Sequence, residues 1–198
     1  AHTVFESAAG GRSRVEWRSN LDFPLPFLIG QAAAADLIVA GRKPETGPLL
    51  CSVDPGDLVM HLGRPVLVVP PETDHLDVRR AAVGWKNTRE ARRAIRDALP
   101  FLSRASRVIV VSIDDGQGAD DTADAIGFLQ AHDIDAVAIR RETRGAPTAQ
   151  VLVEAASEQA ADLIVVGAYG HGRLREWVFG GVTRDLLAGA PLCCLMSH

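Results

Sequence analysis

The sequence has 198 residues, of which 47% are hydrophobic, and a formal net charge of −4 at pH 7. This apolar content suffices for the core of one large or two smaller domains, and an acidic chain without clusters of Lys and Arg among aromatic residues is not expected to bind nucleic acid. No apolar run approaches the roughly 18 residues that span a membrane, and the first residues lack the pattern of a signal peptide, so we expect a cytoplasmic protein without membrane contacts.

The first third of the chain predicts few regular elements. Helices are predicted at 3–10 and 26–36. Strands are predicted at 14–19 and at the residues that end with Gly41. The stretch VDPGD at 53–57 is typical of a helix start, because Asp is favoured as an N-cap residue and proline fits the first helical turn.

From residue 80 on, apolar runs typical of buried strands alternate with helical patterns. Asn87 and Glu90, three residues apart, predict a capping box at the first of these helices. Such alternation is typical of a parallel sheet with helices on both faces, in which ligands bind beyond the carboxyl ends of the strands. The loops at 84–88 and 167–181 are expected at that edge. Strands are predicted at 80–85, 106–113, 134–140, 162–167 and 191–197, and helices at 91–102, 122–133, 147–160 and 181–189.

Two stretches of the chain repeat each other. ADLIVAG at 35–41 and ADLIVVG at 161–167 differ at one position and lie 126 residues apart. We therefore predict two similar modules, 1–72 and 78–198, joined by a polar linker. The first module lacks about one strand–helix–strand unit and no initiating Met is present, so we expect a fragment of a longer chain. A naturally shortened half-module is the alternative.

Glycines gather in GAYGHGRLREWVFGGVT, residues 167–183, between a predicted buried strand and a predicted helix. A glycine-rich loop before a helix N-terminus can hold phosphate through backbone N–H groups and the helix dipole. Neither the lysine of a P-loop nor the third glycine of a dinucleotide fingerprint is present, so those two kinds of phosphate loop are not favoured. The alternative is that the glycines serve only the geometry of the loop.

This combination of elements and glycines resembles the universal stress proteins, whose domain is a five-stranded parallel α/β fold. The ATP-binding branch of that family carries Gly, two residues, Gly, nine residues, Gly and then Ser or Thr. Gly167, Gly170 and Gly180 match this pattern, with Gly181 at the position of the hydroxyl residue. The resemblance implies two tandem Rossmann-like modules of the adenine nucleotide α-hydrolase type, each with a five-stranded parallel sheet and helices on both faces.

The resemblance also implies that the second module binds ATP or another adenine nucleotide, with Mg²⁺ bound to the phosphates of the nucleotide. Lys86 stands where the ATP binders usually have Asp, and a lysine cannot accept a hydrogen bond from ribose or adenine but can meet a phosphate. Gly181 lacks the expected hydroxyl, a loss of roughly 1.5–3 kcal/mol, and Thr183 is close enough in sequence to replace it. The implied cofactor-binding residues are Trp85, Lys86, Ile113, Val166, Gly167, Tyr169, Gly170, Gly180, Gly181, Val182 and Thr183.

A stress-related regulatory role is what the resemblance implies, and no catalytic residue is identified. One alternative is an interaction module that binds no nucleotide. The other is a slow ATPase or phosphotransferase, which would need a general base or water-positioning group and usually a metal site. The acidic stretch DDGQGADD at 114–121 is the nearby candidate for such a site, and it is explained more simply as a flexible loop.

The first module is not expected to hold a nucleotide. At the same offset of 126 residues, Pro44 and Pro55 stand where the second module has glycines, and proline has no N–H to donate to a phosphate. Asp54 adds a negative charge at a third position of the loop. This module is therefore predicted to be a structural partner of the second.

The last strand of each module is apolar and nearly uncharged. Residues 65–70 and 191–196 are predicted to pair within the chain, because each strand would leave an unpaired hydrophobic edge if its module stood alone. A homodimer through the same strands is the alternative that the resemblance implies. Cys193 and Cys194 are neighbours on the second of these strands, so they should face opposite sides of the sheet without a disulfide between them.

Overall fold

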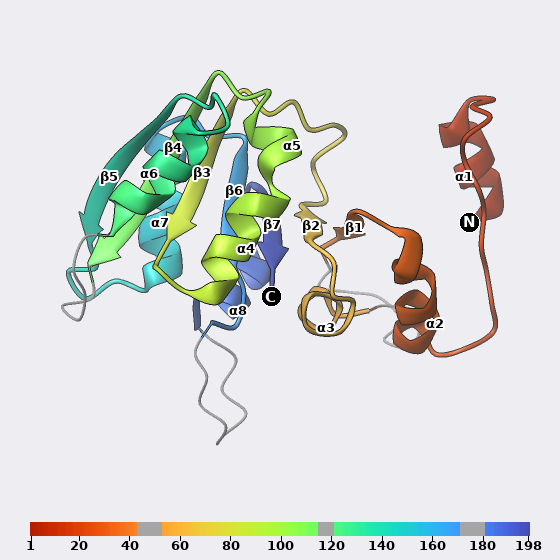
Figure 1. Ribbon diagram of the computed structural model, residues 1–198. Coiled ribbons are helices and arrows are strands. Elements are labelled where there is room, and N and C mark those ends of the chain that lie inside the picture. Colours follow the sequence, from red (N-terminus) through yellow and green to blue (C-terminus); the bar gives the residue numbers. More distant parts are fainter. Residues whose placement is uncertain (43–52, 115–120, 171–180) are drawn as a thin grey trace.

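The computed structural model describes residues 1–42, 53–114, 121–170 and 181–198 (Figure 1). Its centre is a seven-stranded sheet in the order β1-β2-β7-β6-β3-β4-β5. The strands are β1 (Ile38–Gly41), β2 (Val66–Val69), β3 (Arg80–Trp85), β4 (Arg107–Asp114), β5 (Ala136–Glu142), β6 (Leu163–Gly167) and β7 (Cys193–Ser197). The helices are α1 (His2–Ala9), α2 (Pro24–Gln31), η1 (Ala32–Ala34), α3 (Pro55–His61), α4 (Arg89–Asp97), α5 (Leu99–Leu102), α6 (Thr122–Gln130), α7 (Thr148–Glu158) and α8 (Gly181–Gly189). None of the helices within these ranges is both long and apolar enough to cross a lipid bilayer.

The five strands from residue 80 on run parallel to one another. The chain passes from β3 through β4 to β5, and then crosses back to place β6 on the other side of β3, with β7 beyond it. The strand order therefore reverses between β3 and β6, which is where open α/β sheets bind their ligands. The predicted α/β fold, with a mostly parallel sheet between helices, is confirmed.

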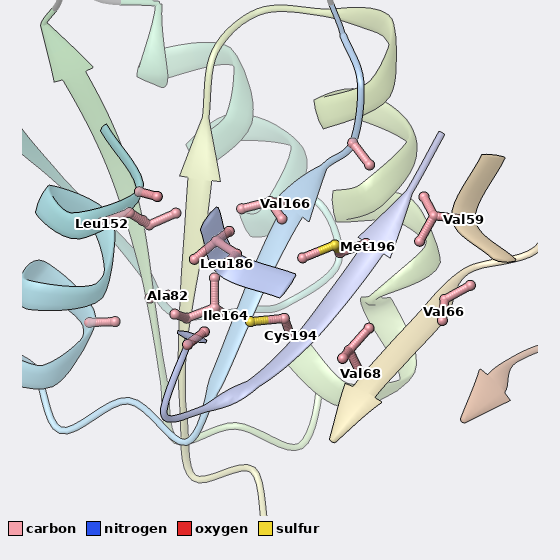
Figure 2. Close-up of a cluster of buried hydrophobic side chains, with 14 of the residues drawn as sticks. Val59, Val66, Val68, Ala82, Leu152, Ile164, Val166, Leu186, Cys194 and Met196 are labelled. Atoms are coloured by element: carbon pink, nitrogen blue, oxygen red, sulfur yellow. The ribbon is translucent and has the colours of Figure 1, made fainter. Parts of the chain in front are cut away.

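Helices cover both faces of this sheet and bury two apolar layers. One layer lies under α3, α7 and α8, which contribute Val59, Leu152 and Leu186 (Figure 2). The other lies under α4 and α6, which contribute Ile95 and Leu129. The central strands are buried on both sides, and this explains why their sequences are continuous apolar runs without a polar alternation.

Cys193 and Cys194 face opposite layers of the core, as their adjacent positions on β7 predict. Both are buried and free. Burial raises the pKa of each thiol, that of Cys194 to about 12. They therefore stay protonated at neutral pH and pack as small apolar residues.

Strands β2 and β7 pair antiparallel, with Val66 opposite Met196, Leu67 opposite Leu195 and Val68 opposite Cys194. The predicted pairing of 65–70 with 191–196 within the chain is thus confirmed. On its other side β2 pairs with β1 in parallel. The part of the chain before residue 70 therefore continues the sheet of the later residues edge to edge. The division into two modules stays a prediction, as does a homodimer.

The predicted strand at 14–19 is wrong, because these residues form no strand and are exposed. Within the described residues the sheet ends at β1, so the segment has no neighbouring strand with which to exchange backbone hydrogen bonds. The ring of Trp17 instead packs on the rings of His2 and Phe5 from α1, with centroids 5.2 and 5.3 Å away. Trp17 therefore makes a local contact with α1 and not a contact within a sheet.

The cap predicted at Asn87 is also wrong, because the helix begins one residue later. Thr88 is the N-cap residue of α4, and its Oγ1 accepts a hydrogen bond from the N–H of Ala91 at 3.3 Å. The N–H of Asn87 donates to the carboxylate of Asp121 at 3.1 Å, which holds Asn87 outside the helix. The predicted single helix is divided into α4 and α5, because Pro100 has no N–H with which to continue it.

Candidate functional site

The residues that follow β3 and β6 meet at the carboxyl edge of the sheet, where the strand order reverses. Gly84 of β3 lies opposite Val166 of β6, so the two strands end side by side. We call the segments 85–88 and 167–170 together the β3–β6 edge. Lys86, the first residue beyond β3, is exposed. The edge thus combines five of the predicted site positions with the N-terminus of α4.

Gly167 allows the end of β6 to lie against the backbone of α4. A Cβ at this position would lie 2.5 Å from the carbonyl carbon of Glu90 and would also overlap the N–H of Ala91. No side chain fits there unless the strand and the helix move apart. The first glycine of the motif is therefore required by packing of strand on helix, whatever the loop binds.

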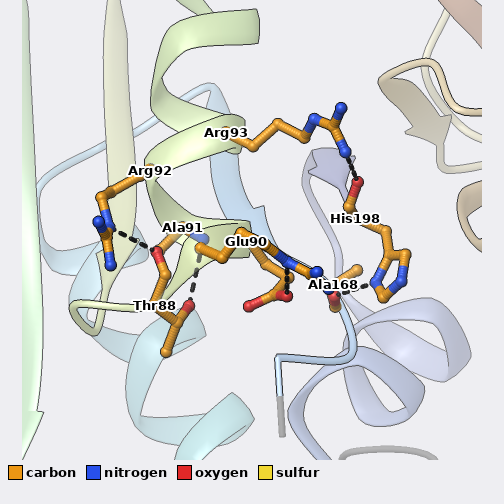
Figure 3. A network of polar contacts seen from close by, with 8 residues as sticks. Thr88, Glu90, Ala91, Arg92, Arg93, Ala168 and His198 are labelled. Carbon is orange, nitrogen blue, oxygen red and sulfur yellow. Dashed lines mark hydrogen bonds and ion pairs between the residues drawn. The ribbon is translucent and has the colours of Figure 1, made fainter. Parts of the chain in front are cut away.

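Gly170 is in close contact with the side chains at the start of α4 (Figure 3 shows Thr88 and Glu90 there). A Cβ at Gly170 would lie 2.9 Å from Glu90 Oε2 and 3.3 Å from Thr88 Oγ1. The second glycine thus leaves room for a carboxylate that sits against the backbone of the loop. A larger residue would displace either the loop or that carboxylate.

Glu90, in the first turn of α4 next to this edge, has a role that the sequence did not reveal. It is only 5% exposed, and its Oε1 accepts a hydrogen bond from Arg89 Nε at 2.8 Å. Burial acts to raise the pKa of this carboxyl, but hydrogen bonds from its own N–H, Arg89 and Thr88, together with the charge of Arg89, outweigh it and leave the pKa lowered. Glu90 is therefore ionised at neutral pH. The spacing of Asn87 and Glu90 in the sequence indicated a helix cap. That spacing does not predict a contact between Glu90 and Gly170.

The ends of β6 and β7 are tied to α4 by a second set of polar contacts (Figure 3). Arg93 Nη1 donates to the carbonyl oxygen of His198 at 2.6 Å. The ring of His198 hydrogen-bonds through Nδ1 to the carbonyl oxygen of Ala168 at 3.1 Å. These contacts fix the first residues beyond β6 relative to the helix.

Tyr169 points away from α4 and toward α3. Its hydroxyl lies beside Gly56, where a Cβ would be 2.5 Å from Tyr169 Oη. Burial raises the pKa of Tyr169 to about 12, with further contributions from the carboxylates of Asp54 and Asp57. The backbone of Tyr169 is left-handed, with φ of 58°. The sequence predicts this residue in the nucleotide site, and its side chain contacts the first part of the chain.

The apolar residues among the predicted site positions lie on both faces of the sheet. Ile113, Val166 and Val182 pack with the layer under α7 and α8. Trp85 is buried in the opposite layer, and its indole N–H donates to the carbonyl oxygen of Asp121 at 3.2 Å. The indole ring of Trp85 therefore lies in the core, and only the backbone of this residue belongs to the β3–β6 edge.

Helix α8 begins at Gly181, which is exposed and has no atom within 4 Å of the position of a Cβ. Thr183 is 3% exposed, and its hydroxyl accepts a hydrogen bond from the N–H of Tyr169 at 3.3 Å. A hydroxyl that already holds this loop is poorly placed to replace the one missing at position 181. Gly180, the third glycine of the motif, lies outside the described residues.

The corresponding helix of the first part of the chain, α3, begins with its own acidic cap. The carboxylate of Asp54 accepts a hydrogen bond from the N–H of Gly56 at 2.7 Å, and Pro55 is the first helical residue. The helix start predicted from VDPGD is confirmed. The N-terminus of α3 is thus occupied by a carboxylate and by the hydroxyl of Tyr169, an arrangement that disfavours a phosphate.

Two surface pockets of the described residues lie away from this edge. One, of about 380 Å³, is lined by the linker before β3 and by Asp162 and Cys193. The other, of about 660 Å³, lies between β5 and α7 and includes Arg141 and Glu158. Neither contains a predicted site residue. The described part of the chain also holds no group of three or more His, Cys, Asp or Glu side chains arranged for a metal ion.

Comparisons with known proteins agree with this architecture. The sequence profile of the Universal stress protein family matches residues 78–198. The crystal structure of a universal stress protein from Archaeoglobus fulgidus DSM 4304 matches 100% of this chain and 75% of its own, at 15% identity and a TM-score of 0.71. A functionally unknown protein from Pseudomonas aeruginosa PAO1 matches 99% of this chain and 75% of its own, at 17% identity and a TM-score of 0.65. No curated protein matches the sequence.

At these identities the two solved structures establish the fold alone. The family profile carries more, because it spans more than half of the sequence and includes β3 to β7 with both segments of the β3–β6 edge. The chain belongs to the universal stress protein family.

Proposed function

We propose that residues 78–198 bind an adenine nucleotide at the β3–β6 edge, and that the chain acts as a regulatory binding protein in a stress response. The observation that carries the proposal is the position of the glycine motif. Gly167 ends β6, Gly170 lies against α4, and Gly181 begins α8. These glycines lie between the point where the strand order reverses and a helix N-terminus, where backbone N–H groups favour phosphate.

The apolar part of the ligand has a surface to lie on. Ile113, at the carboxyl end of β4, and Val182, in the first turn of α8, are half-buried and belong with the buried Val166 to the layer under α7 and α8. We assign the base of the nucleotide to these three residues, because an adenine ring gains most from apolar contact. Trp85 and Tyr169 contribute through their backbones, since their rings are engaged elsewhere.

The polar part of the ligand would meet Lys86 and the start of α8. Lys86 is exposed at the end of β3, and its ammonium group suits a phosphate rather than a ribose. Gly181 offers a backbone N–H at the first residue of α8. Mg²⁺ would come with the phosphates of the nucleotide. A binding role is proposed because a glycine-rich segment before a helix N-terminus supplies backbone N–H donors for a phosphate.

The test uses the two glycines at opposite ends of α8. No atom of the described residues lies within 4 Å of a Cβ position at Gly181 or Gly189, so an aspartate at either position meets no steric clash with them. Gly181→Asp places a negative charge where phosphate is expected, and an acidic residue in the first helical turn does not harm the helix. We expect the affinity for AMP, measured by isothermal titration calorimetry, to fall at least about tenfold.

Gly189→Asp is the matched control, and its affinity for AMP should stay within about twofold of the unsubstituted protein. Circular dichroism checks that both variants are folded. An unchanged affinity in folded Gly181→Asp would remove the start of α8 from the site.

A further inference from the structure

Glu90 brings a negative charge to the β3–β6 edge, which holds Lys86 and Gly170 of the proposed nucleotide site. Its Oε2 lies against the backbone of Gly170, the second glycine of the motif. Its other oxygen accepts a hydrogen bond from Arg89. An anion held by the backbone of Gly170 would have to share this glycine with a carboxylate that is already there.

The ion pair with Arg89 engages one oxygen of Glu90, Oε1 at 2.8 Å, and the other oxygen, Oε2, faces Gly170. Glu90 is 5% exposed and lies on the inner side of the edge, whereas the side chain of Arg89 is 76% exposed. Lys86 is exposed as well. Water and salt screen the exposed charges of Arg89 and Lys86 more strongly than the buried carboxylate of Glu90. The attraction of these two cations for a bound phosphate is therefore weakened more than the repulsion between Glu90 and that phosphate. The carboxylate also competes with phosphate for the hydrogen-bond donors at the start of α4.

We propose that Glu90 is a specificity-determining residue of the nucleotide site, and that it disfavours polyphosphates relative to adenosine and AMP. This inference rests on the proposed function. Repulsion grows with the charge of the ligand, so the penalty is greatest for ATP, smaller for AMP and absent for adenosine. A regulatory protein with this preference responds to nucleosides and monophosphates while ATP is abundant.

A purely structural role of Glu90 makes a different prediction. If the side chain only supports Gly170 and Thr88 through packing, its replacement changes the affinities for all three ligands by the same factor. If its charge selects the ligand, the change depends on the number of phosphates. The graded series of adenosine, AMP and ATP separates the two roles.

The experiment measures the affinities of the full chain for adenosine, AMP and ATP by calorimetry, with and without Glu90→Gln. Glutamine keeps the size and one acceptor oxygen of Glu90, so the packing against Gly170 is retained. We expect the affinity for ATP to rise about tenfold, equivalent to about 1.4 kcal/mol, while that for adenosine stays within about twofold. Glu90→Asp retains the charge and should keep the ligand preference of the unsubstituted protein.

Glu158→Gln is the control for the loss of one negative charge. Glu158 is the last residue of α7, and its side chain pairs at 2.6 Å with Arg141 of β5, the outermost strand beyond β4. Its replacement should leave all three affinities unchanged.

Three results would overturn the inference while leaving the proposed function intact. These are an equal gain for adenosine and ATP in Glu90→Gln, an unchanged ATP affinity in that variant, and an equal gain for ATP in Glu90→Asp. Should Glu90→Gln fail to fold, Glu90→Asp decides, because a changed preference between adenosine and ATP in this charge-retaining variant contradicts the inference. Binding of none of the three ligands to any variant would instead overturn the proposed function together with the inference.

Discussion

Tyr169 connects the proposed nucleotide loop to the first part of the chain. Its N–H donates to Thr183, its hydroxyl lies beside Gly56, and its ring is 6.3 Å from that of His198. A left-handed backbone in a bulky residue is unfavourable by about 1–3 kcal/mol and persists only where surrounding contacts hold it. A ligand that moved the loop would therefore also change the contact between Tyr169 and α3.

The titration of Tyr169 gives a direct measure of this contact, because the sequence contains 1 tyrosine. Burial and the carboxylates of Asp54 and Asp57 raise its pKa to about 12, against about 10 in an unfolded chain. The tyrosinate absorbance of the folded protein should therefore appear at about pH 12, and that of the protein in denaturant at about pH 10.

The same shift predicts a loss of stability in alkali. Below about pH 10 Tyr169 is protonated in both states, so its contribution to the free energy of unfolding is fully present. Between about pH 10 and about pH 12 only the unfolded state releases the proton, and this contribution is lost. The Asp54→Asn variant should titrate at a lower pH, and a folded protein whose tyrosine titrates at about pH 10 would show that the hydroxyl does not lie against α3.

At the scale of elements, the antiparallel pairing of β2 with β7 joins the strands of the first part of the chain to the five strands from residue 80 on. Leu67 lies opposite Leu195, is 6% exposed and packs into the layer under α4 and α6. We expect Leu67→Asp to lower the free energy of unfolding by at least about 3 kcal/mol, because a buried leucine is lost and a carboxylate must be desolvated. Chemical denaturation checks the stability, and size-exclusion chromatography checks for aggregation.

Val39→Asp is the control for this substitution. Val39 lies opposite Leu67 on β1 but is 63% exposed, so its replacement should change the free energy of unfolding by no more than about 0.5 kcal/mol. Equal stabilities of the two variants would contradict the burial of the β2–β7 junction.

The elements of residues 80–197 could be predicted because each has a strong local pattern. The apolar run that became β6 and the helical face that carries Ile95 are examples, and the pairing of 65–70 with 191–196 followed from their apolar edges. The prediction of a strand at 14–19 is wrong because a strand needs a neighbouring strand to pair with. The sequence of 14–19 does not indicate that, within the described residues, β1 is the outermost strand on this side of the sheet. The position of the α4 cap depended on Asp121, which is distant in sequence and holds Asn87 outside the helix.

The site was less predictable, because its main contacts join segments that are far apart in the sequence. The glycine pattern identified Gly167 and Gly170, but the sequence gives no sign that α4 packs so closely on both. The carboxylate of Glu90 at Gly170 and the hydroxyl of Tyr169 at Gly56 are both products of that tertiary packing. Sequence spacing therefore located the loop without revealing its neighbours.

At the scale of the whole molecule, we expect the two parts of the chain to differ in what they can bind. The repeat of 126 residues aligns the start of α3 with the start of α8. Asp54 and Pro55 stand at the first of these helix starts, and Gly181 stands at the second. We therefore expect one nucleotide for each chain, bound by residues 78–198, with the earlier residues serving to cover β7 and to hold Tyr169.

A calorimetric titration of the full chain with AMP measures both the affinity and the number of nucleotide sites. We expect saturable binding of one AMP per chain. Two AMP molecules per chain would contradict the loss of the site in the first part of the chain. Binding of neither adenosine, AMP nor ATP would contradict the assignment of a nucleotide to the β3–β6 edge.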